Sequence, residues 1–281
     1  MATVALDEKY ENLAQLIRGM GRTLIAFSGG VDSTFLAKVA YAVLDRDAVA
    51  VTALSPTYPA TELEEAKVYA AEIGIEHRLI ETHELEREEY AVNNPDRCFH
   101  CKKELFTEMQ VIAQEEGFDT IIYGGIMDDL GDHRPGMEAA KLLNARAPLV
   151  EAELQKHEVR QLSKELGLPT WDKPAGACLA SRIPYGMRVT LERLHEVDQA
   201  ELYLHKLGFR LVRVRHHGDI ARIEAPAEDL LRLFENDVHT QIVAALKEVG
   251  FKYVALDMQG YRSGSLNETL GSHTIVPLQT V

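Results

Sequence analysis

The sequence FSGGVDSTFL, from Phe27 to Leu36, decides how the first half of the chain is interpreted. The apolar run TLIAF at residues 23–27 leads into it and predicts a buried strand that ends at the two glycines. The run STFLAKVAYAVL at residues 33–44 repeats its apolar residues at helical spacing behind a polar cap. The sequence therefore predicts a strand, a tight glycine-rich loop and a helix in direct succession.

The same alternation of strand and helix continues beyond this stretch. A helix is expected before it at 8–20, further strands at 48–54, 77–81 and 119–124, and further helices at 59–73, 101–116 and 157–167. Strands that alternate with helices of this length favour an α/β fold, a parallel sheet with helices on both faces. We assign this pattern to a first domain over residues 1–173.

From residue 174 the pattern changes. An irregular stretch is followed by a helix at 190–207, a hairpin around Gly218 and a final strand at 253–258. In this hairpin the valines are expected on one face, and Arg213, Arg215, Arg222 and Glu224 on the other. These features indicate a smaller α+β domain over residues 174–281.

The composition indicates the class of protein. The chain has 281 residues, 46% of them hydrophobic, and a formal net charge of −14. This composition is globular, and it disfavours nucleic acid as a stable partner because phosphate neutralisation needs a basic surface. No basic start precedes an apolar segment and no apolar run is long enough to cross a bilayer, so we expect a cytoplasmic protein without a membrane partner. Three cysteines in a reducing compartment favour metal or sulfur chemistry over disulfides.

The chemistry of the glycine-rich loop indicates a phosphate site. Ligands of an open parallel sheet bind at the carboxyl ends of its strands, where the N–H groups of Gly29 and Gly30 would be accessible to an oxyanion. Ser28 and Ser33 add hydroxyl donors, and Asp32 can hold Mg²⁺. The spacings of a Walker P-loop and of a dinucleotide fingerprint are both absent. A tight turn capped by serines is the alternative interpretation.

The hexapeptide from Ser28 to Ser33 resembles the SGGxDS loop of the PP-loop ATP pyrophosphatases. This resemblance implies that the loop binds ATP and holds the departing pyrophosphate, while the AMP half activates a carbonyl or carboxyl oxygen by adenylation. It also implies adenine contacts near residues 53–55. A second glycine pair, expected after a later strand, is matched by Gly124 and Gly125.

The three cysteines have several possible roles. Cys98 and Cys101 lie at the start of a predicted helix, where the helix dipole favours a thiolate, and Cys178 lies in the later irregular stretch. A structural zinc site would need a fourth ligand such as His100. A redox relay would carry a persulfide on one thiol and resolve it with another. An iron–sulfur cluster held by three thiolates would leave one iron open.

The later motifs narrow this choice. GDHRPG, CLASRIPYG, VRVRHHGDIARIE and LDMQGYRSGSLNETL, together with the glycine-rich loop, resemble the LarE family across nearly the whole chain. LarE proteins are ATP-dependent sulfur transferases that convert the carboxylates of pyridinium-3,5-biscarboxylic acid mononucleotide into thiocarboxylates, for the nickel-pincer cofactor of lactate racemase. One branch gives up the sulfur of a single cysteine, matched by Cys178. The other holds a 4Fe-4S cluster, and this chain resembles it through Cys98, Cys101 and Cys178.

The resemblance also implies a mechanism and an assembly. ATP adenylates a substrate carboxylate, a sulfide on the open iron attacks the mixed anhydride, and AMP leaves. Because the cysteines persist through turnover, the protein would be a catalyst. The family implies a closed homo-oligomer such as a hexamer, and the sequence does not identify the sulfide donor.

The substrate carries a phosphate and carboxylates, for which arginine and serine are suitable partners. The matched motifs supply the candidates for this role: Ser181, Arg182, Arg215, Arg262 and Ser263. An exposed hairpin face is an equally good interpretation of Arg213 and Arg222. The roles of the acidic residues stay open, with magnesium binding or helix capping for Asp128, Asp129 and Asp132, and arginine or ribose contacts for Glu224 and Asp257.

Two other functions use the same loop. A tRNA-thiolating PP-loop enzyme would act on a nucleobase carbonyl, but the acidic charge of this chain disfavours it. An amide-forming ligase of the NAD or asparagine synthetase type would use the cysteines only structurally. Such a ligase would need free ammonia or a partner, because no glutaminase-like N-terminal cysteine is present.

Overall fold

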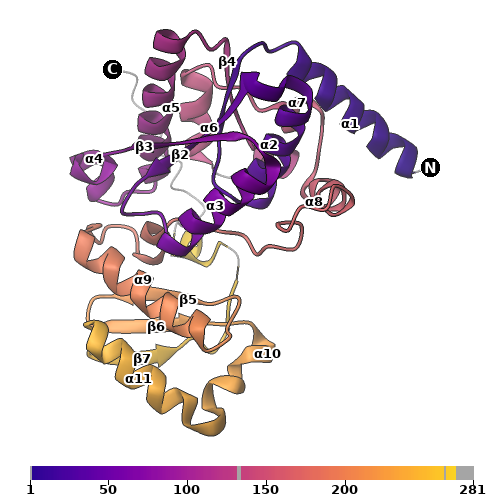
Figure 1. Ribbon diagram of the computed structural model, residues 1–281. Helices are drawn as coiled ribbons and strands as arrows, with labels where there is room; N and C mark the ends of the chain where they lie inside the picture. The colour runs from indigo at the N-terminus through magenta and orange to yellow at the C-terminus, as the bar shows by residue number, and fades with distance from the viewer. Residues whose placement is uncertain (1, 132–133, 263, 270–281) are drawn as a thin grey trace. The chain divides into compact units, whose positions relative to one another are not determined.

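The computed structural model describes residues 2–131, 134–262 and 264–269. The chain forms two compact units, Met1–Ala177 and Cys178–Val281 (Figure 1). The sequence placed its domain boundary after residue 173, and the structural division comes a few residues later, within the same irregular segment.

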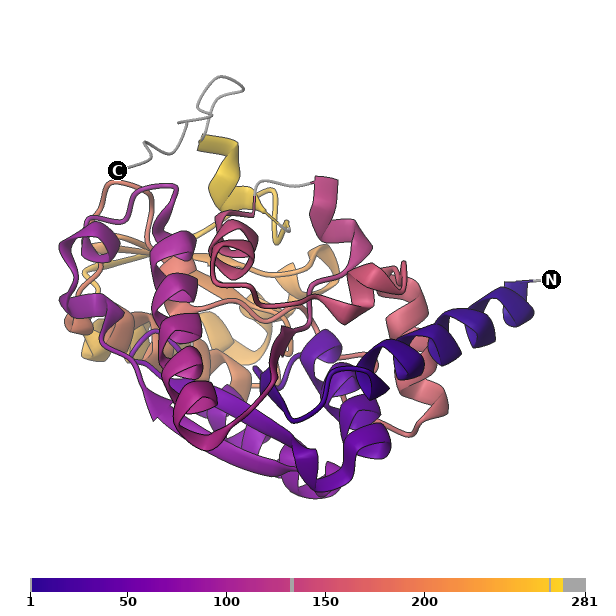
Figure 2. The same ribbon diagram turned by 90° about the horizontal axis from the view of Figure 1, so that it is seen from above.

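The first unit alternates strands and helices. Its described strands are β1 (Thr23–Ala26), β2 (Ala48–Leu54), β3 (Glu76–Glu81) and β4 (Thr120–Tyr123). Its described helices are α1 (Ala2–Arg18), α2 (Val31–Leu44), α3 (Ala60–Ile73), α4 (Glu88–Ala91), α5 (Arg97–Glu116), α6 (Pro135–Leu142), α7 (Pro148–Glu151) and α8 (Lys156–Glu165). Helix α1 is the indigo helix at the N-terminal end of the chain in Figures 1 and 2.

The described strands of this unit form a parallel sheet in the order β3-β2-β1-β4. The chain continues from β1 to β2 on one side and later adds β4 on the other side, so the strand order reverses at β1. Loops that follow strands at such a reversal diverge and leave room for a ligand at the carboxyl ends. The loop after β1 carries Gly29 and Gly30, and the segment after β4 carries Gly124 and Gly125. Both glycine pairs therefore belong to this edge of the sheet.

Apolar side chains cover both faces of the sheet, because successive residues of a strand point to opposite sides. Ile25 and Ala50 belong to a buried cluster with apolar residues of α1, α2, α3 and α8. Leu24 and Val51 belong to a second cluster with residues of α5 and α6. The sandwich of helix, parallel sheet and helix confirms the predicted α/β class.

The second unit is a smaller α+β structure. Its described strands are β5 (Arg213–His217), β6 (Ile220–Glu224) and β7 (Tyr253–Leu256), and its described helices are α9 (Leu191–Lys206), α10 (Ala227–Leu230) and α11 (Val238–Val249). Strands β5 and β6 form the predicted antiparallel hairpin, in which Val214 is opposite Ile223 and Arg215 is opposite Arg222. Strand β7 adds to β6 in parallel. The apolar face of this sheet packs on residues of α9 and α11.

The structure differs from the expectations in several places. Helix α1 spans Ala2–Arg18, where the sequence predicted a helix over residues 8–20. Helix α5 begins at Arg97, before the predicted start at residue 101, so both Cys98 and Cys101 lie within it. The interpretation of Arg213 and Arg222 as a solvent-exposed face of the hairpin is wrong for Arg213, which is only 8% exposed, while Arg222 is half-buried. Among the described helices, none combines the length and the apolar character that crossing a membrane requires.

We expect Gly124→Ala to destabilise the first unit. A Cβ at this position would lie 2.9 Å from the backbone nitrogen of Ser33 and 3.1 Å from the carbonyl carbon of Asp32, both at the start of α2. Backbone atoms cannot move aside as a side chain can, so the unfolding free energy should fall by about 1–3 kcal/mol. Urea denaturation without ligand measures this change. Gly131→Ala is the control, because a Cβ there has no neighbour within 4 Å among the described residues.

Candidate active site

The glycine-rich loop has a conformation that requires glycine at its centre. Gly29 has a φ of +60°, and a Cβ on it would lie 2.9 Å from the Cβ of Ala66 on α3. Gly30 then begins α2 as its N-cap residue. The Ser28 and Ser33 hydroxyls lie 3.1 Å apart, and the Ser33 hydroxyl also accepts the Ser28 N–H. The two predicted serines thus close the loop on itself and place both hydroxyls beside the helix N-terminus.

Two side chains from distant parts of the chain bind the carbonyl groups of this loop. The Tyr58 hydroxyl donates to the Ser28 carbonyl oxygen at 2.6 Å. The Lys173 ammonium donates to the Gly29 carbonyl oxygen at 3.1 Å and forms an ion pair with Glu65 at 2.7 Å. Sequence reasoning did not identify Tyr58 or Lys173 as site residues.

A cationic side chain binds the Asp32 carboxylate. The Lys156 ammonium, from the first residue of α8, donates to both oxygens of Asp32 at 2.6 and 2.8 Å. Burial raises the pKa of the Asp32 carboxyl, Lys156 opposes this, and the nearby Asp129 raises the pKa further. A cation at this half-buried carboxylate would have to displace the Lys156 ammonium.

The second glycine pair lies against the first loop. The close approach of Gly124 to the backbone of Asp32 and Ser33 brings the end of β4 next to the start of α2. Gly125 lies against the ring of Tyr123, where a Cβ would be 2.7 Å from a ring carbon. The structure thus brings together the seven residues predicted to bind ATP, namely Ser28, Gly29, Gly30, Asp32, Ser33, Gly124 and Gly125.

The acidic residues after β4 bind backbone N–H groups and a neighbouring arginine. Asp128 accepts the N–H of Lys156 at 2.8 Å and so caps the start of α8. Asp129 accepts the N–H of Ile126 and forms an ion pair with Arg134 at 3.1 Å. Asp132, the third acidic residue considered for magnesium, lies outside the described residues.

Two of the three cysteines lie one turn apart on the same helix. Cys98 is exposed and Cys101 is half-buried, and their spacing of three residues in α5 places both thiols on one helix face. Cys178 is half-buried and precedes the 3₁₀ helix η4 (Leu179–Arg182), in the second unit. None of the three is in a disulfide.

Thiolates at this spacing are the donors that iron–sulfur clusters use, so the residues fit a cluster chemically. Within the described part of the chain, no group of three or more His, Cys, Asp or Glu side chains forms a metal site.

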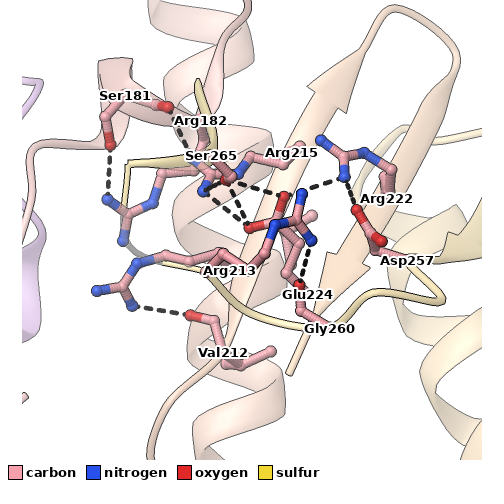
Figure 3. Close-up of polar contacts among 12 residues, drawn as sticks. Ser181, Arg182, Val212, Arg213, Arg215, Arg222, Glu224, Asp257, Gly260 and Ser265 are labelled. Carbon is pink, nitrogen blue, oxygen red and sulfur yellow. Dashed lines mark hydrogen bonds and ion pairs between the residues drawn. The ribbon is translucent and has the colours of Figure 1, made fainter. Parts of the chain in front are cut away.

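A network of buried charges occupies the arginine face of the second unit (Figure 3). Arg182 is 1% exposed and forms a two-pronged ion pair with Glu201 at 2.8 and 2.9 Å. It also donates to the Cys178 carbonyl and the Ser181 hydroxyl, at 3.1 and 3.0 Å. Arg182 therefore connects the segment that carries Cys178 to helix α9.

The centre of this network is Glu224, which is fully buried. Its carboxylate pairs with Arg215 at 2.8 Å and with Arg222 at 3.0 Å. Arg215 also donates to the Ser181 carbonyl and the Ser265 hydroxyl, at 2.9 and 2.8 Å. The Nε of Arg215 is buried and has no partner among the described residues. A buried donor without an acceptor is unusual and suits a site that receives an anionic ligand.

The remaining predicted residues lie at the edge of this network. Arg222 forms an ion pair with Asp257 as well as with Glu224. Arg262 pairs with Glu268 at 3.0 Å on the surface and donates to the Gly260 carbonyl. Ser263 lies outside the described residues.

Sequence reasoning missed Tyr58, Lys156, Lys173 and Glu201. Lys156 and Lys173 are separated from their loop partners by 124 and 144 residues, and no local motif indicated either contact. Glu201 lies on a predicted amphipathic helix, where an acidic residue is normally exposed. A glutamate on the apolar face of that helix was the signal that could have indicated a buried partner.

Comparison with known proteins identifies relatives over the whole length of the chain. An uncharacterised protein of Synechocystis sp. is 48% identical over 265 residues, which cover 94% of this chain and 99% of that protein. The pyridinium-3,5-bisthiocarboxylic acid mononucleotide synthase of Lactiplantibacillus plantarum is 39% identical over 273 residues, 96% of this chain and 97% of the synthase.

More distant similarity extends to an enzyme class with other chemistry. A polypeptide of the glutamine-hydrolysing GMP synthase of Methanococcus vannielii is 26% identical over 213 residues, which cover 72% of this chain and 66% of that polypeptide. No protein-family model matches the chain.

We expect Glu201→Gln to destabilise the protein by about 3 kcal/mol at neutral pH, because it removes the carboxylate charge that pairs with the buried Arg182 guanidinium at 2.8 and 2.9 Å. Burial by itself would raise the pKa of Glu201, but Arg182, Arg213 and the Val214 N–H together lower it below the ordinary value of 4.5. The stabilisation is therefore complete above pH 4.5 and is lost as the pH falls through the lower folded-state pKa.

Urea denaturation of both proteins from pH 7 down to acid pH measures this effect. The difference in unfolding free energy should shrink as the pH falls. Glu268→Gln is the matched control, because its arginine pair is exposed, and it should behave like the wild type. An equal effect of both substitutions at every pH would contradict the assignment.

Proposed function

This chain belongs to the LarE family of pyridinium-3,5-bisthiocarboxylic acid mononucleotide synthases, within the PP-loop ATP pyrophosphatases, and we propose that it performs the reaction for which that family is named. In this reaction ATP drives the conversion of the carboxylates of pyridinium-3,5-biscarboxylic acid mononucleotide to thiocarboxylates, for the nickel-pincer cofactor of lactate racemase. The observation that carries the proposal is the 39% identity to the synthase over 97% of its length.

The first unit would activate the substrate. Gly29, Gly30 and the start of α2 offer backbone N–H groups to the phosphates, and Ser28 and Ser33 offer hydroxyls. Asp32 would hold the Mg²⁺ of the bound nucleotide. A carboxylate oxygen of the substrate attacks the α-phosphorus, the bond to the β-phosphate breaks, and pyrophosphate leaves with that electron pair. The product of this step is an acyl adenylate.

The second step replaces oxygen by sulfur. A hydrosulfide attacks the acyl carbon, the bond between that carbon and the AMP oxygen breaks, and AMP leaves with the electron pair while one proton is released. No electron is gained or lost overall, so the exchange needs no oxidant. Cys98, Cys101 and Cys178 would hold the 4Fe-4S cluster. When bound, the cluster would supply the sulfur at an iron that no protein thiolate occupies.

The buried charge network of the second unit is suited to binding an anionic substrate. Arg215 has a buried donor at Nε with no acceptor among the described residues, and Ser181 accepts from Arg215 with its carbonyl and from Arg182 with its hydroxyl. We propose that the substrate phosphate or carboxylate is bound by Ser181, Arg182, Arg215, Arg262 and Ser263. The two oxygens of such a group match the planar fork of an arginine, which a lysine cannot reproduce.

The GMP synthase relatives support one alternative, an amide-forming ligase. Their similarity covers 72% of this chain, and an adenylated acceptor is common to both chemistries. In a ligase the cysteines would be dispensable and ammonia would replace sulfide. Thiolation of tRNA is a further alternative, and retention of the protein on tRNA at moderate salt would support it. For the proposed reaction the partners are a small nucleotide, a sulfide donor and further copies of this chain in a closed homo-oligomer.

We expect Asp32→Asn to weaken the binding of the Mg²⁺ that the first step uses. The substitution removes the charge that would bind Mg²⁺ but keeps the shape of the side chain. Pyrophosphate release should need roughly ten times more Mg²⁺ for half-maximal rate, which corresponds to the loss of one charged ligand contact. Asp45→Asn is the control, because Asp45 lies at the other end of α2. An unchanged magnesium titration would remove Asp32 from the metal site.

The cysteines can be tested by separating the two half-reactions. Anaerobically purified wild-type protein should contain iron and acid-labile sulfide and should form several products per chain when sulfide is supplied. Cys178→Ala should keep substrate-dependent pyrophosphate release, because the adenylation residues lie in the first unit, but it should lose the thiocarboxylate product and the bound iron.

His100→Ala is the matched control, because His100 is the candidate fourth ligand of a zinc site. It should keep both iron and product formation. A colourless protein that contains zinc would contradict the cluster. One product per chain, with loss of the Cys178 sulfur, would assign the protein to the single-cysteine branch.

A further inference from the structure

Two consecutive peptide groups of the glycine-rich loop are held by side chains on their carbonyl side. Tyr58 binds the Ser28 carbonyl, which belongs to the peptide group that also contains the Gly29 N–H. Lys173 binds the Gly29 carbonyl, which belongs to the peptide group that contains the Gly30 N–H. The chain contains no cis peptide bond among the described residues. Each of these peptide groups therefore has its C=O and N–H pointing in opposite directions.

The contacts to the two carbonyls also fix the direction of the amide hydrogens. With both carbonyls fixed toward Tyr58 and Lys173, the N–H groups of Gly29 and Gly30 must point away from these two side chains. Neither N–H has an acceptor among the described residues. The N–H of Ser28, one residue earlier, is already taken by the Ser33 hydroxyl. The two glycine amides are thus the oriented donors of the loop that remain open to a ligand.

Neighbouring side chains keep Lys173 in place. The Lys173 side chain is 16% exposed, pairs with Glu65 and lies 5.2 Å from the ring centre of Tyr69. Its backbone is fixed by Arg160, which donates to the Lys173 and Trp171 carbonyls at 2.8 and 2.6 Å.

Tyr58 keeps its proton. Burial raises the pKa of its phenol, and the nearby Glu62 and Glu65 raise it further. The phenol therefore remains a hydrogen-bond donor throughout the neutral range.

We propose that Tyr58 and Lys173 are positioning residues that orient the Gly29 and Gly30 amides, before any ligand arrives, toward the pyrophosphate portion of ATP. The role follows from peptide geometry, because a carbonyl that is fixed on one side fixes the N–H on the other. Glycine is the residue that most needs such support, since it has more backbone freedom than any other. Donors oriented in advance bind an anion without the cost of ordering the loop on binding. This inference rests on the proposed use of ATP.

The experiment compares the affinities of inorganic pyrophosphate and of AMP, measured by calorimetry on the full chain. Tyr58→Phe and Lys173→Met each remove one carbonyl contact and keep most of the side-chain volume. Each should weaken pyrophosphate binding roughly five- to tenfold, as the loss of one hydrogen bond predicts, and should leave AMP binding unchanged. Lys173→Arg keeps a cationic donor and should recover part of the affinity.

Tyr69→Phe and Lys67→Met are the matched controls. The ring of Tyr69, which phenylalanine keeps, lies 5.2 Å from the Lys173 ammonium, and Lys67 forms an ion pair with Glu64 on the surface of α3. Both variants should bind pyrophosphate like the wild type. Thermal unfolding without ligand should show that all variants are folded. If either Tyr58→Phe or Lys173→Met is unstable, the other variant still tests the proposal.

Several outcomes would overturn the inference. Unchanged pyrophosphate affinity in both variants would show that the carbonyl contacts do not orient the amides. Equal losses for pyrophosphate and AMP, with a lower melting temperature, would show a merely structural role. A wild-type protein that binds neither pyrophosphate nor ATP would instead contradict the proposed function, so the two failures are distinguishable.

Discussion

The approach of the glycine-rich loop to helix α3 is the constraint on which the proposed ATP site depends. Gly29 has a left-handed φ and lies so close to Ala66 that a side chain would overlap its Cβ. This contact fixes the turn between β1 and α2, and with it the direction of the first N–H groups of the helix. The Gly124 backbone packs against the same turn from β4. The chemistry proposed for the loop therefore depends on two positions where the chain leaves no room for a Cβ.

One face of the sheet in the second unit buries charged side chains. Its hairpin packs valines on the helices, as an ordinary sheet does, but its other face buries Arg213, Arg215 and Glu224. Buried ion pairs seldom stabilise a protein more than apolar residues of the same size would. The proposed function gives their presence a reason, because a fixed arrangement of arginines would be ready to accept an anionic substrate. The buried Nε of Arg215, which has no partner in the described part of the chain, is consistent with this explanation.

The chain is similar both to a bisthiocarboxylic acid synthase and, more distantly, to GMP synthase. The similarity to GMP synthase spans less of the chain than the similarity to the bisthiocarboxylic acid synthase does. Adenylation of an oxygen is common to the proposed sulfur transfer and to the alternative amide-forming reaction. The two reactions differ in the nucleophile, which is sulfide in the first and ammonia in the second. In the proposed reaction, the cysteines and the buried arginines would direct an activated carboxylate toward sulfur.

The sequence alone determined the order of strands and helices, the α/β class, the arginine hairpin and the glycine pairs, because these depend on local periodicity and on residues that lie within a few positions of each other. The LarE resemblance came from motifs that are local in the same sense. Only the tertiary structure showed that Lys156 pairs with Asp32 and that Lys173 and Tyr58 hold the loop carbonyls. It also showed that Glu201 neutralises Arg182 inside the protein. These contacts join residues far apart in the chain, and no local pattern records which distant side chain will fill a given space or balance a given charge.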